Sequence, residues 1–194
     1  MPMSRSFLVA VGANLPEVGG TCVAVVQSAI ARLSHESGQI LSVSMLYSTP
    51  AFPAGSGPDF VNAALVLSSE RTPEEMLAEL HRVEQLFGRE RKKRWGPRAL
   101  DLDLIACDDL VLPNEAEQRR WMALPAEDQT RLAPETLILP HPRIQDRAFV
   151  LVPLCDVAPD WRHPLLNLTA RQMRDDLAAS DLEAVKALAE PTCP

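Results

Sequence analysis

Two aspartates on one predicted strand carry the clearest chemical potential in this sequence. Asp101 and Asp103 alternate with leucines over residues 100–104. Alternate residues of a strand share a face, so the two carboxylates lie side by side, about 6.5–7 Å apart, while the leucines enter the core. Such carboxylates repel each other unless a cation lies between them, and Mg2+ prefers oxygen ligands that it shares with substrate phosphates. The pair predicts a magnesium site, although a bare D-x-D is more often two solvated aspartates.

A cationic segment directly precedes the acidic pair. Six of the ten residues from 89 to 98 are basic, in a chain whose net charge is −7. Arginine beside a magnesium site offers bidentate donors to phosphate oxygens and positive charge to a phosphoryl group in transfer. This combination favours a polyphosphate substrate over a solvated loop. The motifs GxxxxGK[ST] and GxGxxG are both missing from the sequence, which argues against a P-loop enzyme or a protein kinase.

A ring and an amide share a face of another predicted strand. Phe60 and Asn62 are two residues apart within the run 60–67, so they point the same way. A flat, hydrogen-bonding heterocycle suits this combination. The alternative is that Phe60 is ordinary core, but the intervening residues already supply an apolar face, so burial would have to come from both sides of the sheet.

The elements that position these residues follow the order β-α-β-β-α-β. We expect strands at residues 7–11, 41–47, 60–67 and 100–106, and helices at residues 18–33 and 73–87. Thr72 would cap the second helix, with Glu75 completing a capping box, and Gly88 would end it. This order predicts an α+β, ferredoxin-like antiparallel sheet with both helices on one face and the other face free for a site.

The rest of the chain extends this core within one domain, residues 1–194. The core spans about residues 6–160, and a polar segment at about 114–133 interrupts it as an inserted loop or short helix. We expect that segment to be dispensable for chemistry. A strand-like run at 137–142, a helix at 147–157 and a helix at 169–179 follow. The last helix, capped by Thr169, lies in a C-terminal tail of about 165–194 whose end, past residue 190, is frayed.

Composition sets limits on partners and location. No apolar run approaches the roughly 20 residues that a membrane span needs, and the first six residues are too short and polar to precede a secretory core, so we expect a cytoplasmic protein. The acidic balance argues against a nucleic-acid partner. Four scattered cysteines are expected to be free thiols, the histidines have no metal-binding spacing, and we expect a monomer.

The run RWGPRALDLD at residues 94–103 resembles the signature of the 6-hydroxymethyl-7,8-dihydropterin pyrophosphokinase family. Further stretches agree in order at residues 12–14, 47–50, 58–64, 139–141 and 147–149, so the resemblance covers about residues 7–159. It implies a ferredoxin-like enzyme of folate biosynthesis, a 2-amino-4-hydroxy-6-hydroxymethyldihydropteridine diphosphokinase. Such an enzyme transfers the terminal diphosphate of ATP to the hydroxymethyl group of the pterin and releases AMP.

The resemblance also implies a role for each matching residue. Asp101 and Asp103 would hold two magnesium ions. The catalytic set would be Arg89, Arg91, Arg98, Asp101 and Asp103. The ATP site would be lined by Glu84, Arg91, Trp95, Arg98, His141 and Arg147. The pterin pocket would be lined by Thr49, Pro50, Phe52, Phe60, Asn62 and Phe149, with the phenylalanines at 60 and 149 stacking on the two faces of the ring.

Some positions depart from the family pattern. Phe60 stands where many relatives have tyrosine, so stacking survives without the hydroxyl. His81 stands where glutamine is often found, and residues 136–138 lack an arginine that often contacts the nucleotide. The 37 residues between Asp103 and His141 exceed the length found in compact relatives.

The reaction that the resemblance implies is in-line attack of the pterin hydroxyl on the β-phosphorus of ATP, promoted mainly by positioning and charge. Asp103 or a magnesium-bound water is the candidate base, and loops at residues 12–20, 49–58 and 89–97 would close to exclude water. Two rivals remain: a non-catalytic regulatory domain that binds a small ligand, and a kinase that transfers one phosphate and yields ADP.

Overall fold

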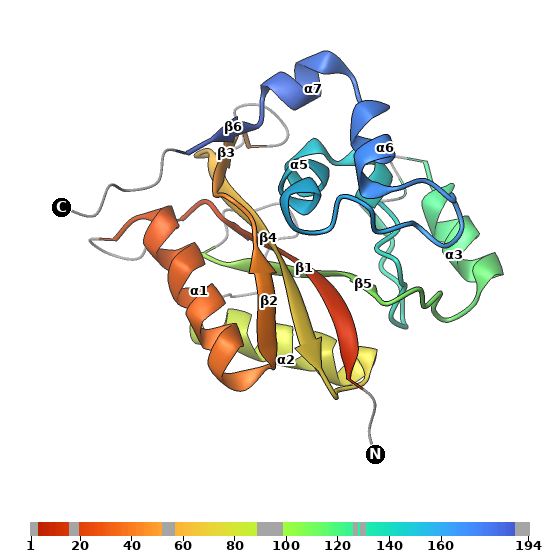
Figure 1. Ribbon diagram of the computed structural model, residues 1–194, viewed down its shortest axis with the longest axis horizontal. Coiled ribbons are helices and arrows are strands. Elements are labelled where there is room, and N and C mark those ends of the chain that lie inside the picture. The colour runs from red at the N-terminus through yellow and green to blue at the C-terminus, as the bar shows by residue number, and fades with distance from the viewer. Residues whose placement is uncertain are drawn as a thin grey trace.

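A six-stranded antiparallel sheet lies at the centre of the protein (Figure 1). The computed structural model describes residues 4–15, 20–51, 57–88, 99–125, 128 and 131–188. The sheet order is β5-β1-β4-β3-β6, and β2 also pairs with β4. The strands are β1 (Arg5–Ala13), β2 (Gln39–Val43), β3 (Tyr47–Thr49), β4 (Phe60–Ser69), β5 (Asp101–Cys107) and β6 (Lys186–Ala187). All predicted core strands are therefore present, with β1 and β4 at the centre.

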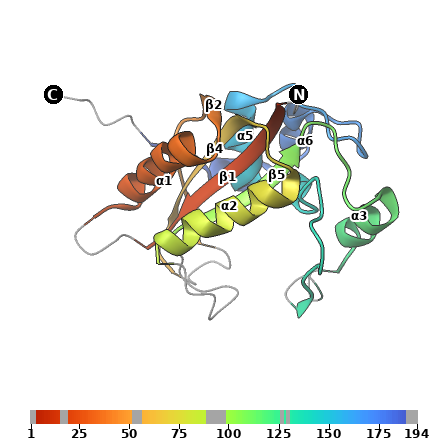
Figure 2. The ribbon, with the colours of Figure 1, turned by 90° about the horizontal axis from the view of Figure 1, so that it is seen from below.

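Two helices cover one face of this sheet, as predicted. They are α1 (Cys22–Glu36) and α2 (Pro73–Leu86), and Figure 2 shows them side by side across the strands. Their buried stripes, which include Leu33 and Leu80, pack against Phe7 and Leu65 of the central strands. The capping box at Thr72 is confirmed. The first helix begins later than expected, at Cys22, because Thr21 caps it by accepting the N–H of Ala24.

The opposite face is not free over its whole area, and this part of the fold prediction was wrong. Two further helices, α5 (Ala148–Val157) and α6 (Ala170–Asp175), cover part of it. Leu8 and Ile105 from the sheet form a second core there with Leu151 and Leu154 of α5. Apolar burial therefore does come from both sides of the sheet. On this face Asp101 and Asp103, near the start of β5, are half-buried.

The remaining elements connect these layers. They are α3 (Glu115–Met122), a 3-10 turn η1 (Ile144–Asp146) and α7 (Ala179–Glu183). The predicted run at 137–142 forms only a bridge between Leu112 and Leu139, and the predicted helix at 169–179 divides into α6 and α7. Leu177, which lies between these two helices, packs against the second core. The frayed end predicted past residue 190 lies outside the described residues.

The predicted strand at 41–47 is two strands. Ser44 interrupts it, because its hydroxyl accepts the N–H of Ala64 and donates to the carbonyl of Met45. Asp156 of α5 then accepts both the Met45 N–H, at 3.1 Å, and the Tyr47 hydroxyl, at 2.8 Å. Side-chain groups thus replace ladder hydrogen bonds at the break.

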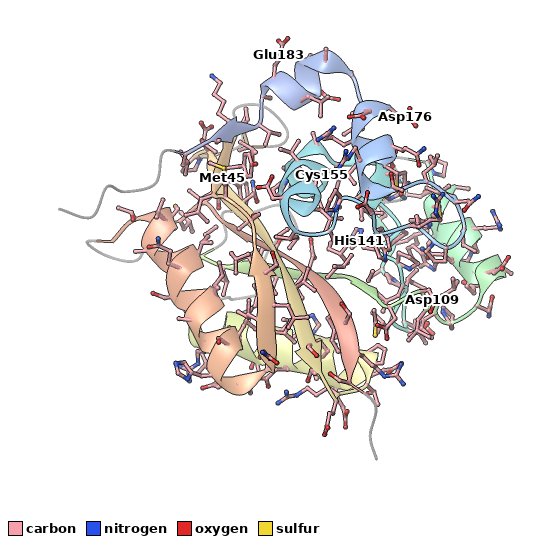
Figure 3. The ribbon with its side chains drawn as sticks, viewed as in Figure 1. Met45, Asp109, His141, Cys155, Asp176 and Glu183 are labelled. Atoms are coloured by element: carbon pink, nitrogen blue, oxygen red, sulfur yellow. The ribbon has the colours of Figure 1, made fainter. Side chains whose placement is uncertain are left out.

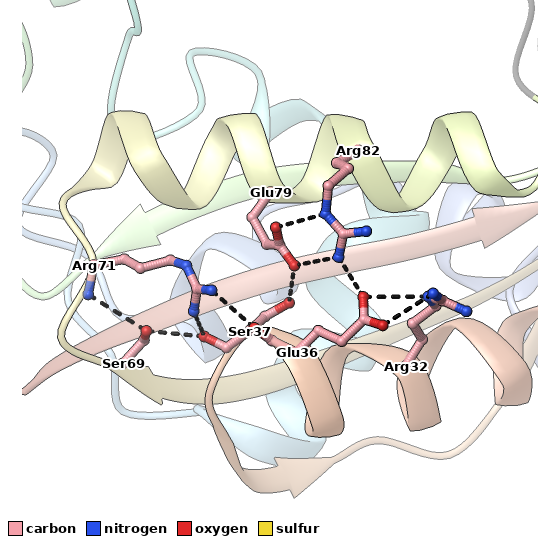
Figure 4. Close-up of polar contacts among 7 residues, drawn as sticks. All are labelled: Arg32, Glu36, Ser37, Ser69, Arg71, Glu79 and Arg82. Carbon is pink, nitrogen blue, oxygen red and sulfur yellow. Dashed lines mark hydrogen bonds and ion pairs between the residues drawn. The ribbon is translucent and has the colours of Figure 1, made fainter.

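A polar network joins the end of α1 to Arg71, which precedes α2, and to Glu79 and Arg82 within α2 (Figure 4). Arg71 donates to the carbonyls of Ser37, at 2.5 Å, and Glu36, at 2.8 Å. Ser69 donates to the same Ser37 carbonyl, and Arg82 bridges Glu36 and Glu79. The last carbonyls of a helix have no partner within it, so Arg71 satisfies groups that α1 leaves open.

Replacing Arg71 with alanine is expected to destabilise the fold and leave activity at room temperature unchanged. Hydrogen bonds from a charged donor contribute about 1.5–3 kcal/mol, and each kcal/mol lowers Tm by roughly 2–4 °C in a chain of this size. Thermal unfolding followed by circular dichroism measures the change. Arg32→Ala is the control, because its exposed pair with Glu36 should contribute only about 0.3–0.5 kcal/mol. Equal stability of the two variants would contradict this role for Arg71.

Two smaller observations concern composition. Cys22, Cys107 and Cys155 are free thiols, as predicted, and Cys193 lies outside the described residues. Among the helices that the structure describes, none combines the length and apolar character needed to cross a bilayer.

Candidate active site

One row of residues crosses three adjacent strands on the partly uncovered face. Gly12 of β1 pairs with Asp101 of β5 on one side and with Asn62 of β4 on the other. Directly paired residues of antiparallel strands point to the same face. The sheet therefore brings together the predicted metal ligand and the predicted heterocycle-binding amide, with a residue that has no side chain between them.

The acidic pair lies as predicted. Asp101 and Asp103 are half-buried, and Leu102 between them is 2% exposed on the opposite face. Arg147, which precedes α5, places Nη1 3.6 Å from Oδ2 of Asp103. The same guanidinium lies over the ring of Phe149, 5.6 Å from its centroid. The structure thus joins three predicted site residues at the N-terminus of α5.

Glu84, which was expected to line the ATP site, is a buried residue of α2. Its side chain is 1% exposed on α2, and Oε1 accepts the backbone N–H of Leu102 at 2.8 Å. This hydrogen bond fixes β5 between the two aspartates. Glu84 therefore supports the strand that carries the acidic pair.

His141 is held by backbone groups beside β5. The backbone N–H of His141 donates to the carbonyl of Ile105 at 2.7 Å. The ring Nδ1 of His141 accepts a hydrogen bond from the backbone N–H of Arg143 at 3.1 Å. With Nδ1 as acceptor, the neutral imidazole carries its proton on Nε2. Burial, together with the nearby positive charge of Arg147, lowers the pKa of His141 to about 3, although Asp101 acts in the opposite direction. Nε2 is thus a neutral hydrogen-bond donor.

The His141 imidazole is expected to stay neutral in the folded protein between about pH 5 and 8. Its 15N shifts should not titrate over this range, whereas the urea-denatured chain should titrate near the ordinary pKa of about 6.5. Because the folded pKa is lowered, the associated stability is complete above about 6.5 and is lost as the pH falls toward 3. The signal is assigned by its loss in His141→Gln. A midpoint near 6.5 in the folded protein would show that the imidazole is not held in this way.

The heterocycle-binding residues form the other end of the row. Asn62, 6% exposed, donates from Nδ2 to Oγ1 of Thr49 at 2.7 Å. A Cβ on Gly12 would lie 2.8 Å from Oδ1 of Asn62 and 3.8 Å from the ring of Phe60. The missing side chain at position 12 therefore makes room for the amide. Phe60 pairs with Thr49 across the strands, so it shares this face.

The remaining predicted pocket residues are less enclosed or lie elsewhere. Pro50 is exposed, and the side chain of Phe149 is 37% exposed. Five predicted residues lie outside the described part of the chain: Phe52, Arg89, Arg91, Trp95 and Arg98. Their roles stay predictions.

Sequence reasoning missed a polar contact beside Asn62. Tyr47 pairs with Asn62 across the strands, and its hydroxyl donates to Asp156. Burial, followed by the contact with Asp156, raises the pKa of Tyr47 to about 12, so the phenol stays protonated as a donor. The partners are 109 residues apart, and nothing in the local pattern around Asp156 marks it.

Comparison with known proteins places this arrangement in a family. The family model of 7,8-dihydro-6-hydroxymethylpterin-pyrophosphokinase (HPPK) matches residues 8–159. A 2-amino-4-hydroxy-6-hydroxymethyldihydropteridine pyrophosphokinase of Synechocystis sp. is 37% identical over 86% of this chain and 73% of its own length. The enzyme of the same name from Pseudomonas aeruginosa is 35% identical over 96% of this chain and 98% of its own.

Solved structures agree with this fold. A Plasmodium falciparum HPPK-DHPS crystal structure superposes with a TM-score of 0.68 at 15% identity, covering 96% of this chain. The chain spans 48% of that protein, and at 15% identity the likeness concerns the fold alone. The match of the family model over residues 8–159 and the relatives at 37% and 35% identity lead to one conclusion: the chain belongs to the HPPK family.

Proposed function

We propose that this protein transfers the diphosphate of ATP to the hydroxymethyl group of 6-hydroxymethyl-7,8-dihydropterin, giving AMP and the pterin diphosphate in folate biosynthesis. The observation that carries the proposal is the row from Asp101 through Gly12 to Asn62. In this row one carboxylate of the acidic pair and a buried amide lie on the same face of the sheet, which supports a metal-bound phosphate chain at one end and a heterocycle at the other. Membership of the HPPK family supports the same reaction.

Asp101 and Asp103 are the proposed ligands of two magnesium ions. The donor set fits this metal, because the two carboxylates share a face and Mg2+ commonly takes one or two protein carboxylates and completes its shell with water and phosphate oxygens. Among the described residues, no group of three or more His, Cys, Asp and Glu gathers as a closed metal cage. When bound, magnesium supplies charge neutralisation to the transferring phosphates.

At the pterin end, Asn62 offers its amide and Phe60 offers a ring on the same face. The hydrogen bond from Nδ2 of Asn62 to Thr49 fixes which amide atom faces the pocket. Because Nδ2 is engaged, Oδ1 is the atom that would accept hydrogen bonds from N–H groups of the pterin. Thr49, Pro50, Phe52 and Phe149 are the further proposed lining residues. The phenylalanines at 60 and 149 would stack on the two faces of the pterin.

At the phosphate end, Arg147 and His141 are the proposed described donors. Arg147 lies near Asp103 through an ion pair that is long and partly exposed, so its guanidinium can turn toward an anion. His141 donates from Nε2 without adding charge. Glu84 contributes through β5, and the further proposed contacts are Arg89, Arg91, Trp95 and Arg98.

The proposed reaction is a single displacement. The pterin hydroxyl oxygen attacks the β-phosphorus of ATP and loses its proton to Asp103 or to water, the bond from that phosphorus to the α-phosphate oxygen breaks, and AMP leaves. The protein holds the hydroxyl and the phosphorus in line and supplies positive charge from its arginines, so positioning does most of the catalysis.

We also propose that the chain is a ferredoxin-like domain with a C-terminal extension, acting as a monomer in the cytoplasm. The strand order, with α1 and α2 on one face, supports the fold name. The free thiols of Cys22, Cys107 and Cys155 suit a reducing compartment.

The product of the reaction tests the function. Incubation with ATP, magnesium and hydroxymethyl-dihydropterin should give AMP and the pterin diphosphate in equal amounts, and chelation of the metal should stop the reaction. ADP as the product would identify a kinase that transfers one phosphate. Metal-independent ATP binding without turnover would identify a regulatory domain.

A further inference from the structure

Helix α3 docks through a glutamine. In Figures 1 and 2 this helix stands apart from the sheet, and the chain that follows it runs back toward β5. Gln118 is its only buried residue, with an exposed fraction of 0%. Helices usually dock through apolar stripes, so a lone buried amide indicates that its hydrogen bond matters.

That amide reaches the residue before His141. Nε2 of Gln118 donates to the buried carbonyl of Pro140 at 2.5 Å. Oε1 of Gln118 is buried and has no hydrogen-bond partner among the described residues. The hydrogen bond that the buried amide makes is therefore the one from Nε2 to Pro140. Position 140 is thereby tied to α3.

A second anchor lies on the other side of His141. The guanidinium of Arg143 donates to the carbonyls of Met122 and Leu124, each at 3.4 Å, at the end of α3. The backbone of Arg143 is also the group that donates to Nδ1 of His141. Helix α3 therefore holds the residue one before His141 and the residue two after it. Figure 3 labels His141 among the side chains between the sheet and α3.

We propose that α3 is a positioning element for the His141 imidazole, and that Gln118 acts on nucleotide binding through it. The inference rests on the proposed function, in which His141 contacts ATP. Because the hydrogen bonds of residues 140 and 143 set the ring's place and tautomer, loosening them turns Nε2 away from the phosphate. The segment 114–133, expected from sequence to be dispensable, then contains a residue that tunes substrate affinity.

Gln118→Met is the test, because methionine has a similar volume and no donor, and it also removes the unpartnered Oε1. The KM for ATP is expected to rise between about 3-fold and 30-fold, which lies within the coupling found for residues in one hydrogen-bonded network, while the KM for the pterin stays within about twofold. Arg119→Met, on the exposed side of the same helix, is the control and should change neither constant.

A double-mutant cycle separates positioning from general loosening. In a His141→Ala background, Gln118→Met should leave the KM for ATP unchanged, because the group it positions is gone. An equal rise in both backgrounds, or no rise in the single variant, overturns the proposal. If Gln118→Met does not fold, Arg143→Met tests the other anchor in the same cycle.

An observation without substrate keeps this inference distinct from the proposed function. The 15N shifts of His141 should report the Nε2–H tautomer in the parent protein and a mixture of tautomers in Gln118→Met. Unchanged shifts overturn the positioning role even if the enzyme makes AMP. Changed shifts in a protein that makes no AMP leave the positioning intact and reject the proposed function.

Discussion

Replacing Asp101 or Asp103 with alanine should lower the rate of AMP formation by at least about 10²–10³-fold, the loss typical of a group that stabilises charge in a transition state. The two carboxylates lie on the same face of β5, and each would supply its own ligand oxygens to the metal, so neither can replace the other. The leucines that anchor the strand are untouched: Leu100, Leu102 and Leu104 are at most 4% exposed. AMP formation, measured by chromatography at saturating substrates, reports the loss.

The fold should survive both substitutions. Removing one of two adjacent carboxylates relieves their repulsion, and the Arg147 pair that Asp103 loses is partly exposed and therefore weak. Tm should stay near that of the parent protein. Asp109→Ala is the matched control, since Asp109 is exposed just beyond the other end of β5. Full activity in either site variant would reject the metal-binding role.

Gly12→Ala should impair use of the pterin selectively. The new methyl group would lie 2.8 Å from Oδ1 of Asn62, closer than real contacts allow. Asn62 cannot simply turn aside, because it is 6% exposed and bonded to Thr49. We expect the KM for the pterin to rise about tenfold or more, in line with a loss of about 1.4 kcal/mol or more from one displaced hydrogen-bonding group. The KM for ATP should change little.

A second variant decides whether the clash is the cause. In an Asn62→Ala background the obstructed amide is gone, so Gly12→Ala should add almost nothing to the loss. Additive losses would show that the extra methyl group acts by another route, such as a general distortion of β1. Initial rates at varied pterin and fixed ATP measure all four members of the cycle.

Local patterns in the sequence predicted the scaffold of the site well. The i, i+2 spacing placed Asp101 with Asp103 and Phe60 with Asn62, because period two is a property of any strand. The capping box at Thr72 was equally readable, since its two hydrogen bonds join residues three apart. Features that arise from contacts within a few residues were therefore available from sequence.

Features that depend on distant partners were not. At the break beside Ser44, the N–H of Met45 donates to Asp156, more than a hundred residues away, and the alternation of small and apolar residues conceals the break. The covering of the second face by α5 left a trace, because every residue from 148 to 157 except Asp156 is apolar, as expected of a helix that packs much of its surface against a core. Gln118 left none, since a glutamine on a charged helix looks like surface.

Strand β1, through Gly12, also sets the distance between the two ends of the site. Adjacent strands lie about 4.7–4.9 Å apart, so two spacings, roughly 9–10 Å, separate Asp101 from Asn62. Backbone hydrogen bonds set this length, and they do not depend on which side chains the strands carry. Substitutions around the site can change the affinity for either substrate. The distance between the carboxylates and the amide changes only if a strand shifts its register, which would move both aspartates or the amide as a unit.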